Sequence, residues 1–186
     1  VLSNGRLIFG VGVGYVKTEF DVIGVPYEER GARTSEHIEA IRALWTQEKP
    51  VFDGRFTQIS GVQSKPSPVQ VPHPPIIIGG GSPAAFRRTI AHGDGWYGFN
   101  QSEEDTVSAI AGLRTAAQAA DRAERFDELE ISIPPRGPID TERVQRFAEL
   151  GVSRLILLPR PQGDSGSPLD GVRRFIEDTA AQLGLN

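Results

Sequence analysis

The amino-acid sequence predicts an α/β fold in which helices cover a parallel sheet. Short segments rich in isoleucine, leucine and valine recur along the chain, and each precedes a segment with helical spacing of its apolar residues. Short strands that are almost wholly apolar are typical of a parallel sheet covered by helices. This alternation builds either a doubly wound open sheet or a (β/α)8 barrel, and the residues alone leave both open. A barrel needs eight strands, and five are found here.

Each predicted element follows from a local pattern. The expected strands are residues 6–13, 76–79, 95–97, 129–133 and 154–158. Helices are expected to begin at serine, threonine or aspartate N-caps. These caps are Thr34 or Ser35, then Ser82, Ser102 and Asp140, and a last helix follows residue 168. The apolar positions expected to face inward on the first and last helices are Ile38, Ile41, Leu44, Trp45, Val172, Phe175, Ile176, Ala180 and Leu183.

One β-hairpin is expected between the first helix and the second strand. Asp53-Gly54 lies between apolar residues in the segment 51–56, and Asp-Gly is a strong signal for a two-residue hairpin turn. The proline-rich residues 60–75 that follow are expected to form an extended surface loop.

The composition excludes several classes of function. The net charge of −4 argues against nonspecific nucleic-acid binding, and no apolar run is long enough for a membrane span. The chain has no cysteine, and its three histidines are scattered, so we expect no disulfide and no metal site. No signal peptide is recognised, and a cytoplasmic location is expected. A single domain is expected from 186 residues.

The strongest local signal is Gly79-Gly80-Gly81-Ser82, between three isoleucines and a helical segment that opens with Pro83. Ser82 is a good N-cap, and proline suits the first helical turn because no N–H is needed there. Three glycines exceed what a tight turn requires. Since free N–H groups at a helix start attract anions, the pattern favours a phosphate site over a turn without a ligand.

The spaced glycines Gly10, Gly12 and Gly14 do not form a dinucleotide-binding fingerprint. That motif is G-x-G-x-x-G with a helix starting at once, but Tyr15 and Lys17 occupy the third glycine position in the two possible frames. These glycines either let a strand and a loop pass closely or face a cofactor. No Ser–His–Asp arrangement or close carboxylate pair is recognised, so the catalytic residues are not identified.

Two stretches, residues 5–45 and 74–98, resemble the luciferase-like monooxygenase superfamily, particularly its deazaflavin-dependent oxidoreductases. The shared pattern is G-x-G-[WY], then E-F, G, R-G-x-R, E and L-W. It is matched here by Gly12, Gly14, Tyr15, Glu19, Phe20, Gly24, Arg30, Gly31, Arg33, Glu36, Leu44 and Trp45. After residue 100 only the rhythm of strands and helices agrees.

The resemblance implies a TIM barrel, (β/α)8, of which residues 1–186 are the C-terminal part, with strands four to eight. Residues 48–74 would be an insertion between strands four and five. It also implies a flavin or deazaflavin across the C-terminal rim. The residues expected to contact this cofactor are Gly79, Gly80, Gly81, Ser82, Ala84 and Ala85 around the phosphate, and Val13, Gly14 and Thr18 on the other side. Some relatives have an acid directly after G-x-G, where this chain has Tyr15.

The function implied is hydride transfer between coenzyme F420 and a small organic substrate. Two alternatives remain at this stage: an FMN-dependent monooxygenase that uses oxygen, and a fragment that keeps the phosphate site without chemistry. The full-length protein could form a homodimer, and the catalytic residues are expected in strands one to three of the barrel.

Overall fold

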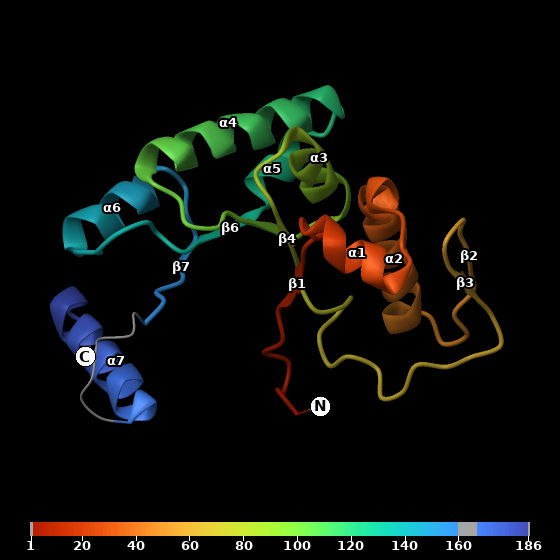
Figure 1. Ribbon diagram of the computed structural model, residues 1–186, viewed down its shortest axis with the longest axis horizontal. Helices are drawn as coiled ribbons and strands as arrows, with labels where there is room; N and C mark the ends of the chain where they lie inside the picture. The colour runs from red at the N-terminus through yellow and green to blue at the C-terminus, as the bar shows by residue number, and fades with distance from the viewer. Residues whose placement is uncertain (1, 160–166, 186) are drawn as a thin grey trace.

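The computed structural model describes residues 2–159 and 167–185. Five strands form one sheet, with helices between them along the chain (Figure 1). The strands of this sheet are β1 (Phe9–Val11), β4 (Ile76–Gly79), β5 (Gly95–Tyr97), β6 (Glu130–Ile133) and β7 (Arg154–Leu155). The helices are α1 (Lys17–Ile23), the 3-10 turn η1 (Tyr27–Glu29), α2 (Arg30–Thr46), α3 (Pro83–His92), α4 (Glu103–Ala119), α5 (Ala123–Asp127), α6 (Thr141–Glu149) and α7 (Pro168–Leu183).

The sheet has the order β1-β4-β5-β6-β7, and every neighbouring pair is parallel. The five strands of this sheet lie side by side in the order in which they occur along the chain. A doubly wound sheet would instead show a reversal of strand order. The sheet is therefore part of a (β/α)8 barrel, as the sequence resemblance implied, and the alternative of a doubly wound sheet is excluded for these five strands.

The helices pack on one face of the sheet. The parallel register aligns Val11, Ile78, Trp96 and Ile131 across four strands, so their side chains lie on the same face. On β1 and β4 this face packs against Ile38 of α2. On β5 and β6 it joins a larger core with α3, α4, α5 and α6, built from residues that include Phe86, Ile90, Leu113, Phe126 and Phe147. Most of the buried apolar side chains thus lie in the core between this face of the sheet and the helices.

The opposite face of the sheet carries Ile77 together with small and polar residues. Gly95 pairs with Ile77 on one side and with Glu130 on the other. A Cβ on Gly95 would collide with the backbone of Glu130, so only glycine fits this close approach. Arg154 forms an ion pair of 2.7 Å with Glu130, and Ser132 donates a hydrogen bond of 2.9 Å to the same carboxylate. In a closed barrel this face would point into the interior.

The segment between β1 and α2 differs from the prediction. It was expected to be a loop, but it contains α1 and η1, and α2 begins at Arg30 instead of near Thr34 or Ser35. Both expected caps lie inside the helix, whose N-cap residue has no capping side-chain hydrogen bond. The start of α2 therefore lacks the local signal on which the prediction relied.

The predicted hairpin is present, but its turn lies elsewhere. β2 (Phe52–Asp53) pairs antiparallel with β3 (Gln58–Ile59), so the connection is residues 54–57 and not the pair Asp53-Gly54. The carboxylate of Glu36 in α2 accepts hydrogen bonds from three backbone N–H groups of this loop, at 2.7 to 2.9 Å. A Cβ on Gly54 would collide with that carboxylate. A side chain distant in sequence therefore sets the length of the turn.

The last helix also departs from expectation. Of the apolar residues predicted to face inward on α7, Val172 and Ile176 are exposed, at 39% and 60%. β7 pairs only with β6 within the described residues, so no further strand lies there for this apolar stripe to cover. Figure 1 accordingly shows α7 standing apart from the other helices. The loop expected before it, residues 160–166, lies outside the described residues. None of the helices described is long and apolar enough to cross a membrane.

Two helical glycines offer a paired test of the packing between α3 and α4. A Cβ on Gly112 in α4 would collide with the ring of Phe86, whereas a Cβ on Gly171 in α7 would meet nothing within 4 Å. Alanine is favoured over glycine in a helix by about 0.5–1 kcal/mol, but overpacking a core costs about 1–3 kcal/mol. Gly112→Ala should therefore lower the free energy of unfolding by about 1 kcal/mol, and Gly171→Ala should raise it slightly. Urea denaturation measures both, and equal stabilisation by the two changes would contradict the packing.

Candidate functional site

The candidate site lies at the edge of the sheet where the parallel strands end. Three loops meet there: residues 80–82 between β4 and α3, residues 98–102 between β5 and α4, and residues 134–140 between β6 and α6. The carboxyl ends of parallel strands carry the active sites of (β/α)8 enzymes. The position of the three-glycine turn at this edge follows from the chain direction of β4.

The glycine turn continues the strand before it bends. Gly80 has a φ of +122°, a conformation that side chains rarely allow. Its N–H group donates to the carbonyl oxygen of Tyr97 in β5 over 3.4 Å, so it extends the ladder between β4 and β5. This donor was predicted to face the phosphate, and the structure places it in the sheet. Gly80 therefore contributes a backbone conformation with positive φ to the turn, and its N–H group is bonded within the sheet.

The start of α3 presents free backbone donors. Ser82 is the N-cap, and its hydroxyl accepts from the N–H of Ala85 over 3.2 Å. The N–H of Phe86 donates to the carbonyl of Ser82 over 3.0 Å. Within the described part of the chain, the N–H groups of Gly81, Ser82 and Ala84 have no partner. Three donors at the positive end of a helix form an arrangement suited to a phosphate or carboxylate.

Gly81 lies in open space at this helix start. A Cβ on it would meet no atom within 4 Å, and its φ lies outside the left-handed region, so the chain itself does not require glycine there. A side chain at Gly81 would instead occupy the space in front of the free donors. A bound anion needs this space to be empty. Ala84 is exposed beside it, whereas Ala85 is buried under the turn, with its methyl group 3.0 Å from the Cβ position of Gly80.

The end of β1 reaches the same edge of the sheet. β1 pairs with β4, and Val11 aligns with Ile78, so the residues after Val11 run beside the glycine turn. Val13 is half-buried there, and Thr18 is exposed in the first turn of α1. Gly14 has a φ of +78°, and a Cβ on it would collide with the ring of Phe20. The structure thus brings both groups of predicted residues to one rim, and their contact with a cofactor stays a prediction.

Trp96 lies directly beneath the glycine turn. Its side chain has no exposed surface, and its indole Nε1 donates a hydrogen bond of 2.8 Å to the carbonyl oxygen of Gly80. A Cβ on Gly98 would collide with the indole ring, so the glycine two residues later leaves room for it. The structure places Trp96 in the core, with its polar end bonded to the turn.

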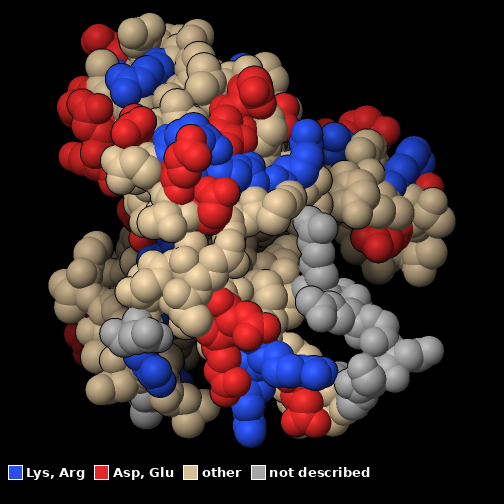
Figure 2. Space-filling model, turned by 90° about the vertical axis from the view of Figure 1, so that its left-hand side faces the viewer, with Lys and Arg blue, Asp and Glu red and all other residues tan. Residues whose placement is uncertain are grey.

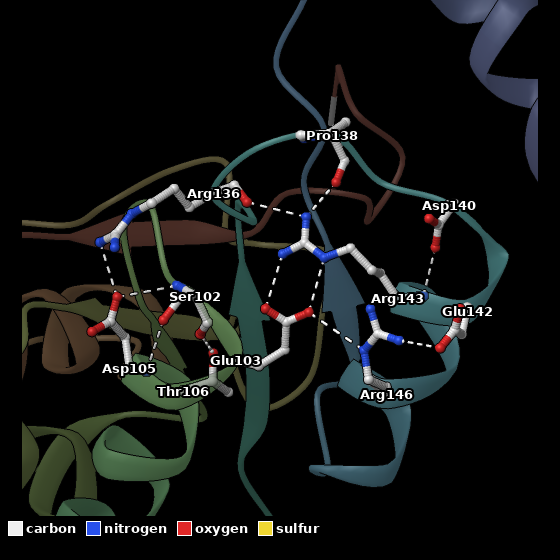
Figure 3. A network of polar contacts seen from close by, with 10 residues as sticks. All are labelled: Ser102, Glu103, Asp105, Thr106, Arg136, Pro138, Asp140, Glu142, Arg143 and Arg146. Carbon is white, nitrogen blue, oxygen red and sulfur yellow. Dashed lines mark hydrogen bonds and ion pairs between the residues drawn. The ribbon is translucent and has the colours of Figure 1, made fainter.

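Arginines hold the two neighbouring loops of the rim together (Figure 3). Arg143 of α6 binds both carboxylate oxygens of Glu103 in α4, at 2.9 and 3.0 Å. The same guanidinium donates to the carbonyls of Arg136 and Pro138 in the loop between β6 and α6. Arg136 in turn binds Asp105 over 2.9 Å. Sequence reasoning missed this network, because its partners lie about 40 residues apart and carry no shared motif.

Electrostatics follow from these contacts. Hydrogen bonds from Arg143 lower the pKa of Glu103 from 4.5 to about 2, helped by the charges of Arg143 and Arg146, against a smaller opposing effect of burial. The partner's pKa is shifted in the matching direction, since bonding to Glu103 raises the pKa of Arg143. Two hydrogen bonds from one guanidinium thus favour the ionised form of the Glu103 carboxylate.

A cavity of about 760 Å³ lies beside the rim, between these loops and α7. Its walls combine polar residues, such as Asn100 and Asp178, with apolar ones, which include Phe99, Pro134, Ile139, Ile156 and Phe175. Figure 2 faces this side of the molecule and shows acidic and basic side chains interleaved on the visible surface, without a continuous basic area. The sequence did not indicate this cavity, because its walls come from elements that are distant along the chain.

His92 lies away from this rim, at the other end of α3. The imidazole is 3.6 Å from Glu39, and burial lowers the pKa of His92 despite that carboxylate. His92 is the last residue of α3.

Comparisons with known proteins bear on the family and the fold of this chain. Residues 1–136 match the family described as Luciferase-like monooxygenase. An uncharacterised protein of Mycobacterium tuberculosis is 31% identical over 185 residues, which are 98% of this chain and 61% of that protein. The FMNH2-dependent dimethylsulfone monooxygenase of Pseudomonas putida is 36% identical over 121 residues, which are 63% of this chain and 33% of that protein. The chain thus spans about 60% of the length of the first of these relatives.

Two solved structures share the fold. An F420-dependent secondary alcohol dehydrogenase, in complex with an F420–acetone adduct, aligns with a TM-score of 0.67 at 17% identity, covering 82% of this chain and 64% of that one. The monooxygenase RslO1 of Streptomyces bottropensis aligns with a TM-score of 0.58 at 24% identity, covering 98% of this chain and 60% of that one.

Glu103 provides a test of the arginine network. Glu103→Gln removes the charge and keeps the shape, and should lower the free energy of unfolding by about 1 kcal/mol at pH 7. The folded-state pKa of about 2 lies below the ordinary 4.5, so this contribution is present above pH 4.5 and is lost as the pH falls towards 2. The difference in urea midpoint between the two proteins should therefore shrink from pH 7 to pH 3.

The control for this experiment is Glu142→Gln. Glu142 is largely exposed, and among the described residues its ion-pair partner is Arg146, four residues further on, so its loss should cost a few tenths of a kcal/mol. A Glu103→Gln effect as small as that of the control at pH 7, or one that stays constant down to pH 3, would contradict the role given to the network.

Proposed function

The chain belongs to the luciferase-like monooxygenase family, and we propose that it forms the phosphate-binding part of a deazaflavin-dependent oxidoreductase. The proposed reaction is hydride transfer between coenzyme F420 and a small organic substrate. In this reaction the cofactor supplies the redox chemistry, and the protein supplies its binding and orientation.

The observation that carries the proposal is the helix start after the three glycines. The unpartnered N–H groups of Gly81, Ser82 and Ala84 face the space in front of α3, and Gly81 leaves that space empty. The positive end of the helix adds to their attraction for an anion. A phosphate fits this donor set, because each oxygen can accept a backbone hydrogen bond while no carboxylate of the turn repels it. Both F420 and FMN carry such a group.

The remaining predicted contacts surround this point. Gly79 ends β4, and a Cβ on it would lie 3.6 Å from the carbonyl oxygen of Val11 in β1, which is an ordinary contact between paired strands. Beyond that contact, Val13, Gly14 and Thr18 would line the side of the cofactor that faces β1. Ala85 and Gly80 shape the turn from beneath, since their N–H groups are engaged within the protein.

The choice of F420 follows the resemblance of residues 5–45 and 74–98 to the deazaflavin-dependent branch of the superfamily. The F420-dependent alcohol dehydrogenase is 17% identical to this chain and shows the fold alone. The second candidate is an FMN-dependent monooxygenase, favoured by the 36% identity with the dimethylsulfone monooxygenase. Since a phosphate site serves both cofactors equally, the residues of that site do not favour either one.

Cofactor titration tests the proposal. The longest form of the protein that its gene encodes is titrated separately with F420 and FMN, followed by absorbance and calorimetry. Saturable binding of F420, with little binding of FMN, is the expected result. Preferential binding of FMN would support the monooxygenase instead. Binding of neither cofactor would reject both enzymes and favour a fragment without chemistry.

Gly81→Leu is the matching variant. The leucine side chain would fill the space in front of the donors without straining the backbone, so the fold should persist while the cofactor binds at least tenfold more weakly, about 1.4 kcal/mol. Gly171→Leu is the control, because that position is equally open but lies on α7. Unchanged affinity in Gly81→Leu, measured by calorimetry, would place the phosphate elsewhere.

These 186 residues, produced alone, are not expected to turn over substrate. β1 and β7 each pair on one side only among the described residues, and a barrel has no such edges. Exposed edges and apolar surface, at about 25 cal/mol per Å², favour association. Gel filtration should show self-association, and assays with F420 and FMN should show no turnover, whereas a form extended at the N-terminus should be active. A monomeric, active short chain would refute this expectation.

A further inference from the structure

The indole of Trp96 holds the Gly80–Gly81 peptide in one orientation. The hydrogen bond from Nε1 to the carbonyl oxygen of Gly80 is 2.8 Å long, and the indole that donates it has no exposed surface. The other contact of Gly80, from its N–H to Tyr97, is 3.4 Å long and therefore weaker. The bond from Trp96 is the shorter of the two restraints on this residue.

Peptide geometry connects this bond to the donors of the site. In a trans peptide, the carbonyl of one residue and the N–H of the next point in opposite directions. Since the carbonyl of Gly80 points towards the buried indole, the N–H of Gly81 points away from the core and into the open space at the helix start. One hydrogen bond from a buried indole thus fixes the direction of a donor on the surface.

Without the hydrogen bond from Trp96, the peptide between Gly80 and Gly81 would rotate easily. It lies between two glycines, and glycine has access to both signs of φ at little cost. Rotation of the peptide by half a turn would remove the N–H of Gly81 from the site and present the carbonyl oxygen of Gly80 in its place. An oxygen with partial negative charge would repel an anion, so the turn needs a restraint that its own residues do not supply.

Close packing fixes the position of the indole of Trp96. Gly98 leaves room for its outer ring, and the ring of Phe86 packs against it at a centroid distance of 6.0 Å. Gly112 of α4 in turn leaves room for Phe86. The two glycines and the two aromatic rings, which meet edge to face, therefore pack together beneath the turn. The indole N–H of this group donates to the carbonyl oxygen of Gly80.

We infer that Trp96 is a positioning residue for anion binding, which acts by keeping the N–H of Gly81 directed into the site. The inference rests on the proposed function insofar as the anion is the phosphate of the cofactor. It assigns to a buried tryptophan a role in affinity that is separate from its contribution to the core.

Trp96→Phe tests this inference, because phenylalanine keeps an aromatic ring and removes the donor. Trp45→Phe is the control, since Trp45 packs on Phe9 and His73 and its indole makes no hydrogen bond among the described residues. Inorganic phosphate is the first probe and the cofactor that binds the wild type is the second. Affinity for both should fall at least fivefold in Trp96→Phe and stay unchanged in Trp45→Phe.

A ligand-free measurement separates this inference from the proposed function. The orientation of the Gly80–Gly81 peptide is read from residual dipolar couplings of the Gly81 amide, or from a crystal structure of the variant. It should be single in the wild type and flipped or mixed in Trp96→Phe. An unchanged single orientation overturns the inference, whether or not any cofactor binds. Phosphate binding with equal affinity by wild type and Trp96→Phe also overturns it, while leaving the proposed function intact.

A second replacement guards against misfolding of Trp96→Phe. Benzothienylalanine has the shape of tryptophan with sulfur in place of the N–H group, and it can be incorporated at position 96 by genetic code expansion. This isostere fills the core and lacks only the donor, so it should lose phosphate affinity to the same extent as Trp96→Phe. Wild-type affinity in a folded protein with this residue would show that packing alone accounts for Trp96.

Discussion

The pairing of β4 with both of its neighbours is the constraint on which the rest of the structure depends. Ile76 and Ile78 pack on α2, while the backbone of β4 bonds to β1 on one side and to β5 on the other. This pairing brings the end of β1 and the start of α3 to the same rim. A shift of register by one residue would turn the isoleucines to the opposite face and would move Gly80 away from Trp96.

The sequence predicted those parts of the structure that local patterns control. Ser82, Ser102 and Asp140 each cap a helix as expected, because a capping side chain bonds to N–H groups two or three residues away. The predicted strands lie where the apolar runs are, although β1 and β7 are shorter than expected. Both are edge strands within the described residues, so fewer of their residues find a partner. The order of the strands came from the family resemblance and not from the residues alone.

The parts that sequence reasoning missed depend on distant residues. Glu36 of α2 sets the hairpin turn at residues 54–57 by accepting three backbone hydrogen bonds there. The sequence of that loop does not indicate that a distant carboxylate binds it. Arg143 likewise reaches Glu103 across 40 positions of sequence. The role of Trp96 needed the positions of Gly80 and Gly98 together, since an apolar ring in a strand looks the same whether or not its N–H has a partner. Fold patterns are local, whereas these site contacts are tertiary.

The site divides into a part that one βα unit supplies and a part that needs several strands. The free donors belong to the turn between β4 and α3, and the restraint on them comes from the adjacent strand β5. An anion can therefore be recognised by a small region of the barrel. A cofactor ring and a substrate are larger, and catalytic residues in a (β/α)8 enzyme come from the ends of several strands. The arginine network joins two further loops at the same rim, next to the proposed phosphate site. In the proposed function, phosphate binding would need only neighbouring residues, whereas the chemistry would need residues from several strands.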